Sequence, residues 1–180
     1  MLAPMEPHEE AILAAAVGKE GAALIRPFLE EVRFADGEAL LTDGVVSSWL
    51  YVLLEGELAI VHESPEGRVA LGKRPPGCWS GEVGVIDGGP ASATVLASGP
   101  CRLLRIDHAS LLRLTDERPD VASVLLRHIM KQLVERIISS SSGIVEQVAP
   151  GQVFVRKPEP PAAARGWAAS MFGWLTGGPR

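Results

Sequence analysis

The sequence predicts a mainly β domain with flanking helices, built on a small antiparallel β-barrel or jelly roll. Between residues 32 and 106, short runs of Val, Ile and Leu recur about every 8–12 residues, with Gly-containing turns between them. Residues 50–54 and 58–62 also show apolar alternation. Helix-forming sequence lies on both sides of this region. Many short strands separated by turn signals are typical of a barrel or jelly roll.

The first element expected is a helix over residues 9–30. Ala, Ile and Leu dominate this stretch, and they favour helices. Gly18 and Gly21 are expected to break it into two pieces, because glycine is a poor helix former. The strands of the β region follow, up to residue 106.

Helical signals return at Asp107, where Asp107 or Ser110 is suited to cap a helix that Pro119 stops or restarts. Residues 121–139 then form one long amphipathic segment, which the run of Ser residues from 139 onwards is expected to end. Its apolar stripe is wide. Two interpretations remain open for the helix 121–138: it packs only on its own domain, or it pairs with a twin helix in a homodimer.

The composition is that of a globular protein, with 47% hydrophobic and 22% charged residues and a net charge of −5. Lys and Arg are scattered, which argues against a nucleic-acid-binding face. Cys78 and Cys101 show neither a CxxC spacing nor metal-ligand partners, so we interpret them as buried apolar residues. The acidic N-terminus does not resemble a secretory signal, and no apolar run reaches the ~20 residues of a membrane span, so we expect a cytoplasmic protein.

The C-terminal region reads as a tail. Residues 140–165 are predicted to be a linker, with a possible strand at 152–155, and residues 166–180 a short aromatic helix. Its apolar side chains fall at helical spacing: Trp167, Met171, Phe172, Trp174 and Leu175. We expect this segment to dock on a protein partner. Packing on its own barrel is the next alternative, and a membrane interface the third, because the helix carries few basic residues.

The segment 81–95 carries the chemistry. A Gly-rich turn opens a brief helical turn at Gly81, so backbone N–H groups point at one spot. Glu82 is placed to accept hydrogen bonds from sugar hydroxyls. The alternative, equally open, is that its carboxylate only satisfies backbone N–H groups of the turn.

Three motifs in order, at residues 34–38, 50–58 and 81–95, resemble those of the cyclic nucleotide-binding domain family, which includes catabolite-activator-type regulators and protein kinase regulatory subunits. The resemblance covers roughly residues 28–138. It implies cAMP or cGMP as ligand, with Gly81 and Glu82 at the ribose and a backbone N–H. It also implies an Arg for the cyclic phosphate, and here that position is Ala91. The neighbouring Ser92 retains a hydroxyl for a phosphate oxygen.

The absence of this cation is expected to weaken phosphate binding strongly. A guanidinium–phosphate contact contributes about 1.5–3 kcal/mol, so its removal weakens binding roughly tenfold to more than a hundredfold. Arg74, on the strand before the turn, is the best substitute. Arg102 and Arg105 lie on the following strand.

These observations divide the chain into a helical segment (1–30), a cyclic nucleotide-binding-like β domain with closing helices (31–139), a linker (140–165) and a docking segment (166–180). Residues 140–180 show no helix-turn-helix pattern, and no nucleophile–base pair or metal cluster supports an enzyme. We therefore expect a non-enzymatic regulatory or adaptor module with a degenerate, ligand-free site and no cofactor. The alternative is a stand-alone cyclic-nucleotide sensor with altered phosphate recognition, signalling through a partner.

Overall fold

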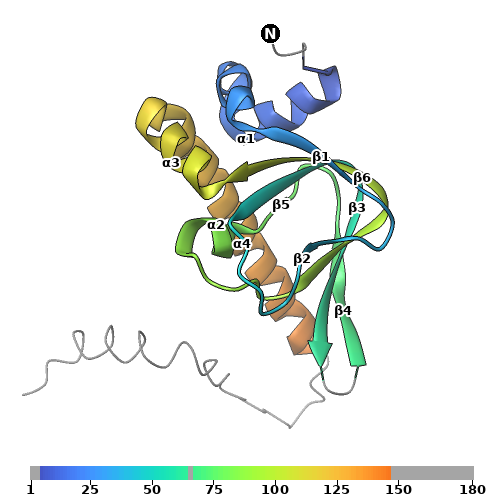
Figure 1. Cartoon of the computed structure of the whole chain (residues 1–180). Helices are drawn as coiled ribbons and strands as arrows, with labels where there is room; N and C mark the ends of the chain where they lie inside the picture. Colours follow the sequence, from blue (N-terminus) through green and yellow to red (C-terminus); the bar gives the residue numbers. More distant parts are fainter. Residues whose placement is uncertain (1–4, 65–66, 147–180) are drawn as a thin grey trace, which may run out of the picture. The chain divides into compact units, whose positions relative to one another are not determined.

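The computed structural model describes residues 5–64 and 67–146, and in this part of the chain six strands pair into one antiparallel sheet (Figure 1). The strands are β1 (Glu30–Phe34), β2 (Ala39–Leu41), β3 (Trp49–Ser64), β4 (Gly67–Arg74), β5 (Trp79–Ser80) and β6 (Thr94–Asp107). Their order is β1-β6-β3-β4, with β2 also on β6 and β5 also on β3. The mainly β class is confirmed, but the sheet is open rather than a closed barrel.

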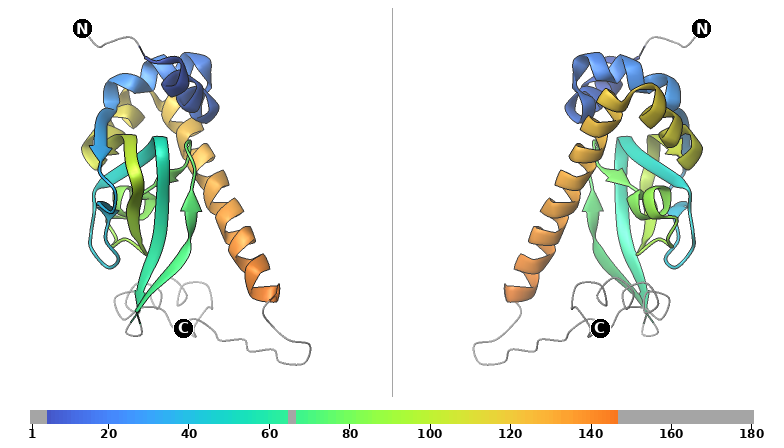
Figure 2. Two further views of the ribbon diagram at one scale, coloured as in Figure 1. Left: turned by 90° about the vertical axis from the view of Figure 1, so that its right-hand side faces the viewer. Right: turned by 90° about the vertical axis from the view of Figure 1, so that its left-hand side faces the viewer.

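Helices flank the sheet: α1 (Pro7–Ile25), the 3-10 turn η1 (Arg26–Phe28), α2 (Glu82–Asp87), α3 (His108–Glu117) and α4 (Pro119–Glu146). Helices α1 and α3 lie together at one end of the sheet, and α4 runs from there beside the strands (Figure 2). The helix α2 interrupts the path from β5 to β6. None of the described helices is long and apolar enough to cross a membrane.

The expected break in the first helix occurs at one of its two glycines. Gly18 has φ +80° and ψ 163°, which kinks α1. Gly21 instead lies inside the helix and is buried against Val17, so it does not break the helix. Glycine costs about 1 kcal/mol in a helix interior. Tertiary packing overrides a preference of that size.

The helix α3 begins where the sequence places it, and α4 begins at Pro119, two residues before the expected start at 121. The Asp107 carboxylate accepts a hydrogen bond from the Ser110 amide at 2.7 Å, which caps α3. Pro119 then opens α4 at its first position, where the missing N–H costs nothing. The expected end of this helix at residue 139 is wrong, because α4 continues to Glu146. Serine is only mildly unfavourable in a helix, so a Ser run does not stop one.

The two faces of the sheet bury separate apolar clusters. The first cluster contains Leu50, Val52 and Leu54 of β3 and packs against α1, α3 and α4. The second contains the alternate residues Tyr51 and Leu53. This is the period-2 alternation of a strand with both faces covered.

A bulge in β3 then changes which residues face each cluster. The register against β6 shifts between Leu53 and Glu55 and again between Glu55 and Glu57. Beyond it, the even-numbered Leu58 and Ile60 belong to the second cluster. Gly56 has φ +94°, and a Cβ there would overlap Cys101 and the Pro100 carbonyl. The bulge therefore requires glycine.

Candidate functional site

The segment that the sequence singles out forms a tight corner between β5 and α2. Gly81 has φ +100° and precedes the first residue of α2. A Cβ on Gly81 would overlap the Trp49 carbonyl, and a Cβ on Gly84 would overlap the Ser47 carbonyl. Helix α2 therefore lies directly against the backbone that enters β3. Glycine at both positions allows this approach, which places Glu82 at the start of the helix.

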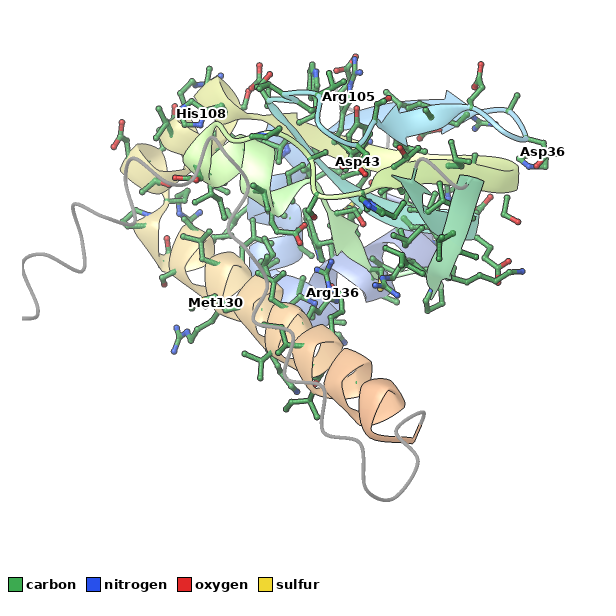
Figure 3. The ribbon with its side chains drawn as sticks, turned by 90° about the horizontal axis from the view of Figure 1, so that it is seen from below. Asp36, Asp43, Arg105, His108, Met130 and Arg136 are labelled. Atoms are coloured by element: carbon green, nitrogen blue, oxygen red, sulfur yellow. The ribbon has the colours of Figure 1, made fainter. Side chains whose placement is uncertain are left out.

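Glu82 is paired with an arginine of the long helix. Its Oε1 accepts a hydrogen bond from Nη1 of Arg136 at 3.1 Å. The Glu82 side chain is 13% exposed and that of Arg136 24%. Figure 3 shows Arg136 on the side of α4 that faces the sheet, with Met130 on a different side. The carboxylate that the sequence places at a ligand is therefore bound to α4 in this structure.

Two polar residues one helical turn apart fasten α4 to this corner. Arg136 also donates from Nη2 to the Trp79 carbonyl at 3.3 Å. Gln132 accepts from the Trp79 amide at 3.1 Å and donates to the Gly77 carbonyl at 3.0 Å. The amide of Gln132 also lies 3.0 Å from Nε2 of His128, whose pKa burial lowers. A change at Glu82 therefore alters a direct contact of α4.

Ala91 and Ser92 lie in the segment between α2 and β6. The Ala91 amide donates to the Val45 carbonyl at 3.0 Å, and the Gly44 amide donates to the Ala91 carbonyl at 2.9 Å. The Ala91 methyl packs against the second cluster. Ser92 is exposed. Within the described residues, no hydrogen bond or ion pair joins Ser92 or Ala91 to Glu82.

Two of the three arginines considered as substitutes are engaged elsewhere. Arg102 is buried among carboxylates from α1, β1 and β3. Arg105 pairs with Glu30 at 3.0 Å and lies over the Trp49 ring at 3.9 Å. Arg74 has no carboxylate partner in the described part of the chain.

Among the described residues, Cys78 and His62 show no catalytic arrangement. Burial raises the pKa of the Cys78 thiol, which disfavours its nucleophilic thiolate form. His62 pairs with Asp43 at 2.6 Å. Across residues 5–64 and 67–146, no three His, Cys, Asp or Glu side chains gather as metal ligands do.

Sequence reasoning missed the two polar residues of α4. Gln132 and Arg136 lie on the helix face whose apolar members, Leu125 and Ile129, are buried. A polar side chain on a buried helix face must find hydrogen-bond partners. That interruption of the apolar stripe was the available signal, although it does not say which segment supplies the partners.

Comparison with known proteins identifies the fold family. Residues 31–118 match the family profile of the cyclic nucleotide-binding domain. The N-terminal domain of a transcriptional regulator from Streptomyces coelicolor A3(2) is 32% identical, with a TM-score of 0.61, over 72% of this chain and 94% of that one. The chain belongs to the cyclic nucleotide-binding domain family. The family match includes the Glu82 corner and Ala91, whereas Arg136 lies beyond it.

Further cyclic nucleotide-binding domains and regulators are also similar. A cyclic nucleotide-binding domain from Methylobacillus flagellatus KT has a TM-score of 0.73 at 22% identity, covering 81% of this chain and 85% of that one. A "CRP-like cAMP-activated global transcriptional regulator" of Mycobacterium tuberculosis is 25% identical over 126 residues. That match covers 69% of this chain, and the chain spans 56% of the regulator's length. The Streptomyces coelicolor and Mycobacterium tuberculosis relatives are both described as transcriptional regulators.

Proposed function

We propose that this chain is a non-enzymatic regulatory module that binds a cyclic nucleotide at Glu82 and passes the binding event to helix α4. The observation that carries the proposal is the 3.1 Å ion pair between Glu82 and Arg136. A ligand whose ribose hydroxyls donate to Glu82 competes with, or adds to, the guanidinium of α4. Nucleotide binding at Glu82 and the strength of the contact between Glu82 and α4 are then coupled, as allostery between two sites requires.

The ligand class follows from the family and its described members. The Mycobacterium tuberculosis relative is described as cAMP-activated, so cAMP is the first ligand to test and cGMP the second. The largely buried Glu82 carboxylate at the start of α2 supports ribose recognition, because backbone atoms and glycines surround that corner. We propose that Ala91 leaves the usual phosphate position without a charge.

Calorimetric titration of the full chain with cAMP and cGMP tests this function. We expect saturable binding that the Glu82→Gln variant weakens at least tenfold, since a hydrogen bond to a charged group contributes about 1.5–3 kcal/mol. Arg136→Met breaks the same ion pair but retains the carboxylate, so it should still bind. Absence of heat from the wild type at millimolar nucleotide would refute the proposal.

A second candidate function is that of a ligand-free adaptor. The surroundings of Ala91 and Ser92, where the family binds the phosphate, favour it. The Ala91 methyl packs into an apolar cluster, and Ser92 is exposed. An adaptor needs a docking surface, and we propose two candidates. One is the exposed apolar face of α4 at Met130 and Val134, which are 56% and 53% exposed and suit a homodimer. The other is the aromatic segment 166–180, which lies outside the described residues.

Co-purification of a tagged chain with an untagged copy separates these two surfaces. If α4 forms the dimer, Met130→Glu combined with Val134→Glu should abolish recovery of the untagged copy, while Trp167→Ala combined with Trp174→Ala should leave it intact. Loss of other co-purifying proteins only in the Trp variant would assign partner docking to the segment 166–180. If both variants recover everything that the wild type recovers, the adaptor function is wrong.

A further inference from the structure

Arg74 differs from the other arginines that are at least partly buried. The others each pair with a carboxylate: Arg26, Arg102, Arg105, Arg118 and Arg136. Arg74 is half-buried and has no such partner within the described residues. Its Nη1 donates only to the carbonyl of its chain neighbour Lys73 at 3.2 Å, and its Nε is fully buried without a hydrogen-bond partner. A buried cationic donor without a partner carries a desolvation cost that a bound anion would offset.

The strand register places this side chain on the face where Ala91 packs. Arg74 pairs with Leu58 across β4 and β3, and Leu58 pairs with Ala97 across β3 and β6. Directly paired residues of antiparallel strands project from the same face of the sheet. Leu58 and Ala97 belong to the second cluster, against which Ala91 also packs. Arg74 and Ala91 therefore share one face of the sheet.

The charge of the same side chain also acts on the segment that leads into the Glu82 corner. Cys78 stands between the end of β4 and the start of β5. Its pKa is raised by burial first, while the charges of Arg74 and Arg136 lower it and that of Glu82 raises it. All three charged groups therefore act on one thiol, which lies one residue before Trp79, the anchor of Gln132 and Arg136.

We propose that Arg74 is the cation that pairs with the phosphate of a nucleotide bound at Glu82, in place of the charge that residue 91 lacks. This inference rests on the proposed function. The Glu82 carboxylate accepts from the sugar hydroxyls and the Arg74 guanidinium donates to the phosphate oxygens, a charge-assisted contact. The cation of the phosphate site then comes from Arg74 at the end of β4 instead of from position 91.

Binding of cAMP and of the uncharged nucleoside adenosine to the full chain tests the role of Arg74. We expect Arg74→Gln to weaken cAMP about 10- to 100-fold while adenosine binds equally, or equally undetectably, in both proteins. Lys73→Gln is the matched control: it removes a cation from the adjacent residue, which pairs with Glu57 and is exposed. It should leave cAMP affinity unchanged. Adding Ala91→Arg to Arg74→Gln should restore cAMP affinity, which a purely structural role for Arg74 would not allow.

The outcomes are distinguishable. Equal cAMP affinity in the wild type and Arg74→Gln overturns the role of Arg74 but leaves the proposed function standing. An equal loss of cAMP and adenosine also overturns it, because the lost contact is then not to the phosphate. If the wild type binds no nucleotide, the proposed function fails and this inference fails with it. Thermal melting of each variant verifies that the folded protein is being compared.

Discussion

Replacing Gly84 with Ala is expected to lower the free energy of unfolding by about 3 kcal/mol, although only one methyl group is added. The new Cβ would overlap the carbonyl oxygen of Ser47, and its next contact is the carbon of the same carbonyl. Both are backbone atoms, so no side-chain rotation relieves the overlap. Helix α2 must move away from the strand entry, and Glu82 moves with it. Urea unfolding followed by circular dichroism measures the loss.

Gly88→Ala is the control for this substitution. Gly88 ends the same helix with φ +68°, and nothing lies within 4 Å of a Cβ there. Its replacement is expected to cost only the left-handed backbone strain of about 1–2 kcal/mol. A loss for Gly84→Ala no larger than that for Gly88→Ala would contradict the close approach of α2 to β3.

The glycines show how far a sequence can define a site of this kind. The Gly81–Glu82 turn predicts a corner, and the structure has one. The sequence does not reveal that Gly84 is needed because the Ser47 carbonyl lies against it. That contact joins two segments far apart in the chain. Local turn signals are readable because they act through backbone dihedral angles, whereas close approaches depend on the tertiary arrangement.

The long helix illustrates the same limit on the functional side. The position of Pro119 at the start of α4 and the cap of α3 at Asp107 both follow from local backbone preferences. The pairing of α4 with Glu82 through Arg136 spans 54 positions, and no local pattern encodes it. The family motifs single out Gly81, Glu82 and Ser92 as candidate ligand contacts, but no motif points to Arg136, the residue that pairs with Glu82.

Removing the charge of Arg102 is expected to produce the second large effect. This buried arginine lies 2.8 Å from a carboxylate oxygen of Glu6 and 2.8 Å from one of Glu55. Carboxylates of Glu31 and Glu9 lie at 3.5 and 3.9 Å. The Arg102→Met variant keeps most of the volume but leaves four carboxylates around an apolar side chain. Glu6 and Glu55 are 65% and 55% exposed and stay solvated, so we expect the free energy of unfolding to fall by about 2 kcal/mol, less than when one partner of a fully buried pair is lost.

Arg33→Met provides the control, because Arg33 pairs in register with Arg102 and also contacts Glu31. Its side chain is 76% exposed, so its loss should cost less than about 1 kcal/mol. The amide of Glu10, which donates to the Glu6 carbonyl at 2.9 Å, should also exchange its hydrogen faster in Arg102→Met, since Glu6 and Glu9 hold that end of α1 to the sheet. Equal losses in the two variants would mean that the cluster around Arg102 behaves as an ordinary surface pair.

The pH dependence of the two proteins distinguishes a charge effect from a packing effect at Arg102. The hydrogen bond from Arg102, and then its charge, lower the pKa of Glu55. A carboxyl group whose pKa is lower in the folded state stabilises the fold above its unfolded pKa, and this contribution is lost as the pH falls through the folded pKa. Asp107 and Asp120, whose pKa values are also lowered, keep their partners in both proteins and cancel in the comparison. The stability difference between wild type and Arg102→Met should therefore narrow as the pH falls below the ordinary glutamate value of about 4.3. A difference that stays constant from neutral pH into this acidic range would assign the loss to packing instead.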